Sequence, residues 1–271
     1  MSARTSPSPR RDWPALLAHA ARIVESYDTL VTLRQLFYRL VAAALLPNTT
    51  NAYKTLSKHT ADARRLGQFP DLLDRTRTIH RYPTFLSPDE ARKFIRTIYR
   101  RDRTEGQAVS LYLAVEKAGI IEQLLDWFGD LGIPILALGG YTSQTYVDNV
   151  IADVKAAGRP AVLLYAGDFD PSGEDIYRDF VERTDCWHEV RRVALTPEQV
   201  DAYQLPPQPG NEDDCRAAAF EARHGRLVQV ELDALPPDVL RELFAAAIGE
   251  FWNPEAYRRV MDRELAERDA L

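Results

Sequence analysis

The sequence predicts an α/β protein in which a mostly helical N-terminal domain precedes a domain built on a mainly parallel sheet. Two short apolar runs, at 109–115 and 161–166, are rich in Val, Leu and Tyr, which is typical of strands buried on both faces. Amphipathic helical patterns follow both runs, and this alternation favours a parallel sheet covered by helices. Residues 12–103, by contrast, carry helical periodicity and little strand signal.

Three helices are expected in the N-terminal part, after a basic arm at 1–11 that we expect to be disordered. They cover about 12–26, 33–46 and 50–65, and a tight turn joins the last two. A basic second helix after such a turn is typical of a helix-turn-helix unit that binds DNA. A plain helical bundle with a solvated basic face explains the same pattern. The candidate DNA-binding residues are Lys54, Lys58, Arg64 and Arg65.

Residues 68–87 show no clear periodicity, although they lie where a winged helix has its wing. Their basic side chains are Arg75, Arg77, His80 and Arg81. A linking helix then starts at Pro88 and runs to about Arg103, and we place the domain boundary at 104–107. The predicted domains are a winged-helix-like DNA-binding domain at 12–103 and a metal-binding domain with a C-terminal helical extension at 104–271.

The second domain is expected to continue with alternating strands and helices. The predicted elements after the first strand are a helix at 117–128, a strand at 133–138, a helix at 144–157, the strand at 161–166, a helix from about 174, a strand at 190–195, a strand at 227–232 and helices after Pro236 and Pro254.

Three acidic residues stand where buried strands end. Asp168 and Asp170 follow one strand, and because residues two apart in extended chain point the same way, both carboxylates project from its carboxyl end. Glu116 ends the strand at 109–115. Carboxylates this close repel one another unless a cation lies between them, and hard oxygen ligands suit Mg²⁺. The alternative is that the aspartates only cap the next helix. Glu231 and Asp233 repeat the strand-end pattern as supporting candidates.

Charge is divided unevenly along the chain. Residues 1–103 hold 19 Lys and Arg against 9 Asp and Glu, a net charge of +10, whereas residues 104–271 hold 15 against 31, a net charge of −16. The N-terminal part is basic enough to bind phosphate, and the acidic part would repel DNA without a cation. Cys186 and Cys215 lack metal-ligand spacing, which is typical of reduced cysteines in the cytoplasm.

A tyrosine on the second predicted helix is a candidate nucleophile. At 100° per residue, Tyr38 lies about 130° from the centre of the apolar face, so we expect it to face solvent. Arg34 stands one turn earlier, and a neighbouring guanidinium favours a phenolate and binds phosphate. The alternative is an ordinary surface tyrosine.

The strand ending in VEKAG and the strand ending in GDFDPSGEDI, separated by a helix, a strand and a helix, resemble the Toprim domain of topoisomerases, bacterial-type primases and some nucleases. The resemblance covers about 107–195. It implies that Glu116, Asp168 and Asp170 surround a catalytic Mg²⁺.

The stretch TLRQLFYRL ahead of that region is similar to the R-x-x-[FY]-Y motif of the A subunit of type IIB DNA topoisomerases (topoisomerase VI) and its meiotic recombination relatives. Phe37 stands where the family often has a first tyrosine, and Tyr38 stands at the position of the nucleophile. The chain is short for a complete A subunit and looks more like the reduced, stand-alone A-type proteins of plasmids and phages. It has no G-x-x-x-x-G-K-[ST] loop.

This resemblance implies an enzyme that cleaves and rejoins double-stranded DNA. Tyr38 would form a 5′-phosphotyrosyl link, Arg34 would position the backbone, and Mg²⁺ would assist. It further implies a homodimer and a cytoplasmic, nucleoid-associated location, and it leaves open an ATPase partner of the B type, which this chain does not encode. Two alternatives remain: a Toprim nuclease that uses metal-activated water, with Tyr38 incidental, and a non-catalytic DNA-binding module.

Overall fold

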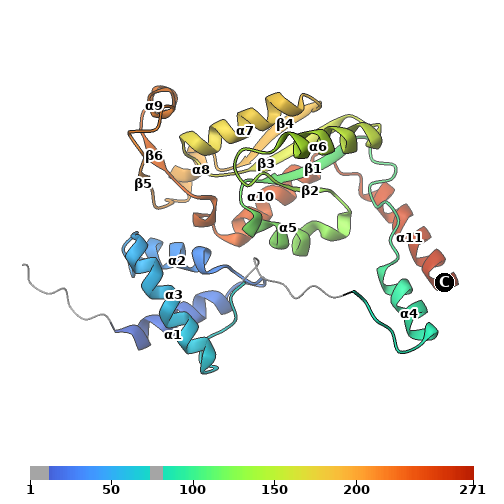
Figure 1. The fold of residues 1–271 in the computed structure, drawn as a ribbon, viewed down its shortest axis with the longest axis horizontal. Helices are drawn as coiled ribbons and strands as arrows, with labels where there is room; N and C mark the ends of the chain where they lie inside the picture. The colour runs from blue at the N-terminus through green and yellow to red at the C-terminus, as the bar shows by residue number, and fades with distance from the viewer. Residues whose placement is uncertain (1–11, 74–81) are drawn as a thin grey trace, which may run out of the picture. The chain divides into compact units, whose positions relative to one another are not determined.

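The computed structural model describes residues 12–73 and 82–271 (Figure 1). The chain divides into two compact units, Met1–Leu73 and Asp74–Leu271. The second unit carries a parallel sheet with helices on both faces, so the α/β class predicted from the sequence is confirmed.

The described part of the first unit contains three helices, close to the predicted ranges: α1 (Trp13–Glu25), α2 (Leu33–Ala42) and α3 (Thr50–Arg65). Each begins behind a side chain that accepts a hydrogen bond from the first turn, and Thr32 forms a full capping box with Gln35. Leu36, Leu40 and Leu56 are fully buried where the three helices pack.

The proposed wing is only partly covered by the structure. Arg75, Arg77, His80 and Arg81 lie outside the described residues. In the part that is described, Leu73 forms an isolated parallel bridge with Thr32, and residues 82–86 are without regular structure.

The second unit is organised around a four-stranded parallel sheet in the order β2-β1-β3-β4. Its strands are β1 (Ser110–Val115), β2 (Ile135–Ala137), β3 (Ala161–Ala166) and β4 (Glu189–Ala194). β1 and β3 are buried at every position, as their apolar runs predict. The chain passes from β1 to β2 on one side and returns to β3 on the other, so the strand order reverses between β1 and β3.

Helices cover both faces of this sheet, and Figure 1 shows α6 and α7 on one face with α5 and α10 on the other. Tyr112 and Tyr165 pack with Val150 of α6 and Phe180 of α7. On the opposite face, α10 packs against β3 and β4. These helices are α5 (Ile121–Phe128), α6 (Gln144–Ala157), α7 (Pro171–Thr184) and α10 (Pro237–Gly249). α7 begins three residues earlier than predicted, because Asp170 caps it.

The remaining elements are small or peripheral. They are α4 (Pro88–Ile98), α8 (Pro197–Ala202), α9 (Ala217–His224), α11 (Pro254–Ala270), β5 (Gln208–Pro209), β6 (Val228–Gln229) and the short 3-10 helices η1 (Ala118–Ile120), η2 (Gly129–Leu131) and η3 (Leu232–Ala234). The strand predicted at 227–232 is thus only β6, which pairs antiparallel with β5. Cys186 and Cys215 are free thiols.

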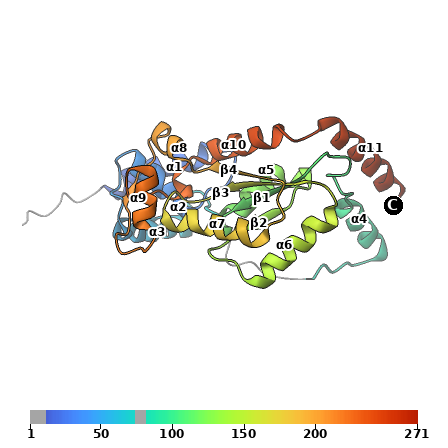
Figure 2. The same ribbon diagram turned by 90° about the horizontal axis from the view of Figure 1, so that it is seen from above.

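Ion pairs attach the segment before β1 to α11. The Arg103 guanidinium donates to both carboxylate oxygens of Glu264, at 3.1 and 2.7 Å, and the Arg101 amide donates to the same carboxylate at 3.0 Å. Figure 2 shows α4 and α11 at the same end of this unit. The compact units therefore divide near residue 73, whereas the sequence suggested 104–107.

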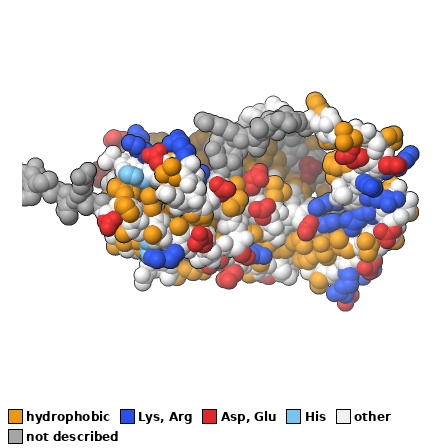
Figure 3. Space-filling view, turned by 90° about the horizontal axis from the view of Figure 1, so that it is seen from below, with side chains coloured by type: hydrophobic (Ala, Val, Ile, Leu, Met, Phe, Trp, Pro, Cys, Tyr) orange, Lys and Arg blue, Asp and Glu red, His pale blue; other side chains and the backbone are white. Residues whose placement is uncertain are grey.

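The apolar residues of α4 lie on one side of the helix. None of its 11 residues is buried. Leu86, Ile95 and Ile98 are 98%, 48% and 55% exposed. In the region of α4, Figure 3 shows hydrophobic side chains beside a group of Lys and Arg. Among the described residues, no helix is long and apolar enough to cross a membrane.

Replacing Glu264 with Gln should lower the free energy of unfolding by about 3 kcal/mol, because it leaves the buried Arg103 guanidinium with only the exposed Asp130 carboxylate as a counter-charge, at 3.1 Å. The side chains of Arg103 and Glu264 are only 7% and 0% exposed. Asp262→Asn removes the same charge from an exposed position of α11 and should change stability by less than about 0.5 kcal/mol. Urea unfolding at neutral pH compares the two variants, and a Glu264→Gln protein as stable as wild type would contradict this role.

Candidate functional site

The candidate site lies at the carboxyl ends of the two central strands. Glu116 directly follows β1, and Asp168 and Asp170 follow β3, which pairs with β1 from Ser110↔Ala161 to Val115↔Ala166. The strand order reverses between these two strands, and in open α/β sheets ligands bind at that position. The structure therefore brings the strand ends of the three predicted carboxylates to one place.

Backbone amides hold two of the carboxylates. The Asp168 amide donates to Glu116 Oε2 at 3.0 Å, and the Gly173 amide donates to Asp170 Oδ1 at 2.6 Å. A Cβ on Gly173 would lie 3.0 Å from Glu116 Oε2 and 2.6 Å from the Asp168 carbonyl oxygen, so this position requires glycine. Asp170 therefore caps α7, as the capping alternative predicts, and this bond occupies its Oδ1.

Asp168 has a different set of partners. Its Oδ1 accepts from the Leu232 amide at 2.8 Å, and its Oδ2 lies 2.8 Å from Lys117 Nζ. The same ammonium lies 2.9 Å from Glu231 Oε2. Glu231, predicted as a supporting residue, thus reaches Asp168 through Lys117, and Asp233 is buried beside it in η3.

Burial and like charge raise the pKa values of Glu116 and Asp168. Burial, followed by the nearby charge of Asp168, raises the pKa of Glu116 to about 7. Burial also raises the pKa of Asp168, although Lys117 and the Leu232 amide oppose this. Burial lowers the pKa of Lys117, but the charges of Asp168 and Glu231 outweigh it and raise that pKa above its usual range. The ammonium is therefore charged at neutral pH.

The donor chemistry fits a hard divalent cation, since all three candidate ligands are carboxylates. Within residues 12–73 and 82–271, however, no group of three or more His, Cys, Asp or Glu side chains is arranged to hold a metal ion. Both oxygens of Asp168 already have protein partners. Ligation by Asp168 requires Lys117 to move from that carboxylate.

Tyr38 does not face solvent, contrary to the sequence prediction. Only 3% of it is exposed, and its ring packs edge-on against Phe37, with the ring centroids 5.5 Å apart. The helical-wheel argument assumed a single covered face, whereas the buried residues of α2 also include Gln35 on the side of Tyr38. Arg34 is exposed, and its guanidinium carbon lies 5.9 Å from the ring centroid of Tyr53 on α3.

The predicted DNA-binding residues lie on the outer side of α3. Lys54, Lys58 and Arg65 are exposed, and one turn of helix separates the two lysines. Arg65 pairs with Asp62 at 2.6 Å, and Arg64 is half-buried with its Nε directed to the Thr60 carbonyl oxygen. The two lysines are the members of this set best placed to contact phosphate.

Sequence reasoning missed Lys117 and Arg192. Lys117 is adjacent to Glu116 in the VEKAG stretch, and that adjacency was the available signal. Arg192 of β4 donates to the Asp168 carbonyl oxygen at 2.6 Å, and a basic residue within the strand predicted at 190–195 was the signal there. No protein-family model matches the chain, and no curated protein matches it either.

Without metal, the pH dependence of stability should carry the signature of Glu116. The pKa of Glu116 in the folded protein lies above its ordinary value of 4.5, so the folded state favours the protonated carboxyl. The resulting contribution to the free energy of unfolding is fully present below pH 4.5 and is lost as the pH rises through about 7. Glu116→Gln should therefore gain on the order of 2 kcal/mol relative to wild type between pH 5 and 8. Thermal unfolding in the presence of chelator, repeated from pH 5 to 8, measures this difference. Glu122→Gln on the surface of α5 is the control. Stability curves against pH that run parallel for Glu116→Gln and wild type would contradict the prediction.

Lys117→Met should bind Mg²⁺ about tenfold more tightly than wild type, because the ammonium no longer competes for Asp168. Calorimetric titration of Mg²⁺ without DNA measures this. Lys155→Met removes the same charge from an exposed position on α6 and should behave like wild type. Unchanged or weaker Mg²⁺ binding by Lys117→Met would show that Lys117 does not compete with a cation.

Proposed function

We propose that this chain is a metal-dependent enzyme that cleaves DNA. Glu116, Asp168 and Asp170 would form its catalytic metal site. The observation that carries the proposal is that three carboxylates follow two adjacent parallel strands at the point where the strand order reverses. Mg²⁺ bound there would neutralise charge on the scissile phosphate. The same order of strands and acidic residues supports assigning the second unit to the Toprim class.

The residues of the site have separate roles in this proposal. Glu116 would hold the cation through its carboxylate, because a bound divalent ion favours the ionised form and offsets the raised pKa of the metal-free site. Asp170 is fixed by its capping bond to Gly173, so its carboxylate is oriented before a ligand arrives. Lys117 is close enough to Asp168 to meet a phosphate oxygen or to make way for a cation.

DNA binding is assigned to the first unit. Its helices α2 and α3, joined by a short turn, support a helix-turn-helix-like domain, and a winged form remains part of the proposal. Lys54 and Lys58 would contact the DNA backbone, with Arg64, Arg65 and Arg34 nearby in the sequence. Such contacts add affinity without sequence preference and offset the acidic second unit.

The burial of Tyr38 favours hydrolysis over covalent catalysis. A phenol that is 3% exposed cannot reach a phosphorus atom unless α2 moves, whereas water needs no such movement. The first candidate is therefore a Toprim-type nuclease in which activated water attacks the phosphodiester, and the bond to the 3′- or 5′-oxygen breaks.

The second candidate is cleavage by Tyr38 in the manner of the type IIB topoisomerase A subunit. It is supported by the TLRQLFYRL stretch, which forms a capped helix with Arg34 exposed. This candidate brings the other properties of that class with it: a homodimer, rejoining of the DNA ends, an ATPase partner of the B type and a nucleoid-associated location.

Supercoiled plasmid incubated with the protein and Mg²⁺, quenched with detergent and treated with protease should yield free DNA ends. Asp170→Asn should reduce the rate at least about 100-fold, since asparagine still caps α7 but lacks the charge. Chelation of Mg²⁺ should abolish cleavage. Tyr38→Phe should cleave at the wild-type rate.

The other outcomes identify the other candidates. Protein covalently attached to 5′ ends, lost in Tyr38→Phe, would replace hydrolysis with the phosphotyrosyl mechanism. DNA binding without cleavage by the wild-type protein would overturn the enzymatic proposal and leave a DNA-binding module. Asp179→Asn on α7 is the matched control for Asp170→Asn, because it removes a carboxylate outside the site.

A further inference from the structure

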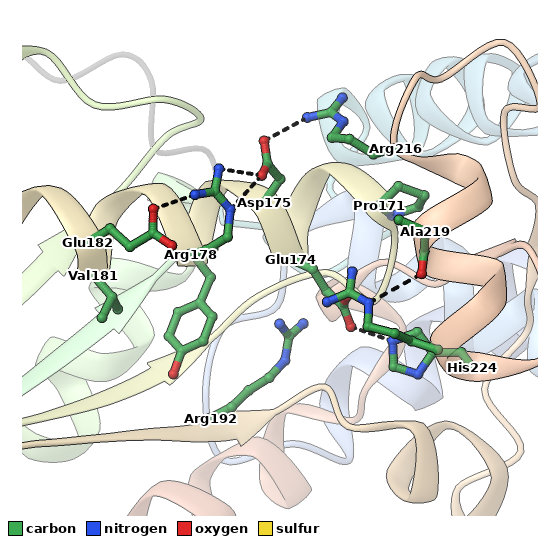
Figure 4. A pocket seen from close by; sticks show the side chains of 12 residues that line it. Pro171, Glu174, Asp175, Arg178, Val181, Glu182, Arg192, Arg216, Ala219 and His224 are labelled. Atoms are coloured by element: carbon green, nitrogen blue, oxygen red, sulfur yellow. Dashed lines mark hydrogen bonds and ion pairs between the residues drawn. The ribbon is translucent and has the colours of Figure 1, made fainter.

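A pocket lies beside the turn that carries Asp168 and Asp170. It has a volume of about 680 Å³ and is lined by α7, β4, α9 and Arg216, which precedes α9 (Figure 4). Pro171 and Glu174, in the first turn of α7, belong to its wall. Arg192 on β4 also lines it and donates to the main-chain oxygen of Asp168 at 2.6 Å. The pocket and the carboxylates are therefore connected through the β3–α7 turn.

An aromatic ring, Tyr177, and the Arg192 guanidinium both line this pocket, and the fully buried Tyr165 packs behind them. Tyr165 and Tyr177 stack with their ring centroids 4.6 Å apart and their planes at 20°. The guanidinium carbon of Arg192 lies 5.7 Å from the Tyr165 ring centroid and 5.9 Å from that of Tyr177. Tyr177 is half-buried and lines the pocket. Nucleic-acid bases stack on flat aromatic surfaces of this kind.

The charges of the lining favour an anion. Four arginines and three carboxylates line the pocket. The carboxylates form ion pairs with Arg178, Arg216, Arg223 and His224. Arg192 is different, because its contacts within the described chain are to the carbonyl oxygens of Leu195, Gly167 and Asp168. Figure 4 shows its guanidinium directed toward α7. A guanidinium without a carboxylate partner is suited to phosphate.

We propose that this pocket binds a nucleotide, with the base against Tyr177 and the phosphate at Arg192. The volume is within the range of about 300–1,000 Å³ usual for small-ligand sites. The nucleotide is either free or an unpaired nucleotide of DNA, and the two share the same chemistry. In the second case the proposal extends the proposed function, because the pocket would hold a base displaced next to the cleavage site.

Ala219 provides the test. It is exposed and lines the pocket, so Ala219→Phe fills the pocket without disturbing the core. Ala218→Phe is the matched control, because Ala218 is exposed on the same helix and is not part of the lining. Calorimetric titrations in metal-free buffer would use dAMP, deoxyadenosine, inorganic phosphate, an eight-nucleotide single strand and the corresponding duplex.

Wild type and Ala218→Phe should bind dAMP or the single strand with affinities that agree within twofold, and Ala219→Phe should bind at least tenfold more weakly. Tyr177→Leu should weaken binding similarly, since it keeps the apolar volume but loses the flat ring. Deoxyadenosine and inorganic phosphate should each bind more weakly than dAMP. Preference for the single strand over dAMP identifies DNA as the source, and equal or stronger binding of dAMP identifies a free nucleotide.

Failure of this proposal differs from failure of DNA cleavage. No binding of any nucleotide probe at millimolar concentration would overturn it, as would equal binding by wild type and Ala219→Phe, or phosphate binding as tightly as dAMP. Because these titrations contain no metal, they do not depend on cleavage. Nucleotide binding by a protein that leaves plasmid intact would support the pocket and overturn the nuclease.

Discussion

Mutual repulsion of buried carboxylates is the constraint on which the second unit depends. Glu116 and Asp168 follow neighbouring strands that are fully buried, so neither carboxylate can move far into water. Each carboxylate of the site receives a donor instead: the Asp168 amide for Glu116, the Gly173 amide for Asp170, and Lys117 with the Leu232 amide for Asp168. Buried charge is tolerated only when it is paired in this way.

This requirement makes the C-terminal part of the chain integral to the site. Leu232 and Glu231, which supply an amide and a carboxylate, are more than sixty residues beyond Asp168. Two backbone hydrogen bonds between Phe169 and Val230, at 2.9 and 3.0 Å, fix this segment against the β3–α7 turn. The sequence placed these residues in a strand of a C-terminal extension, but the structure uses them to complete the environment of Asp168.

The strands and the carboxylate edge were predictable because buried strands are apolar runs and the acidic residues directly follow them. Tyr38 was wrongly placed, because periodicity reports the most apolar face of a helix and not how many faces are covered. The contact of Lys117 with Asp168 depends on the direction of a long side chain, on which residue spacing carries no information. The attachment of Arg103 to Glu264 joins residues 161 positions apart, so the boundary at 104–107 could not account for it.

Asp168 links the two parts of the site. Its carboxylate contacts Lys117, and its main-chain oxygen contacts Arg192, so two cations lie on one residue of an otherwise acidic region. A polyanion that approaches this region is repelled by a net charge of −16 over residues 104–271, and these two side chains are the local sources of attraction at Asp168. In the proposed function, a phosphate that drew Lys117 away from Asp168 would expose a carboxylate oxygen, and that oxygen would then be available to a divalent cation. Substrate and metal would in this way favour each other's binding through a single side chain.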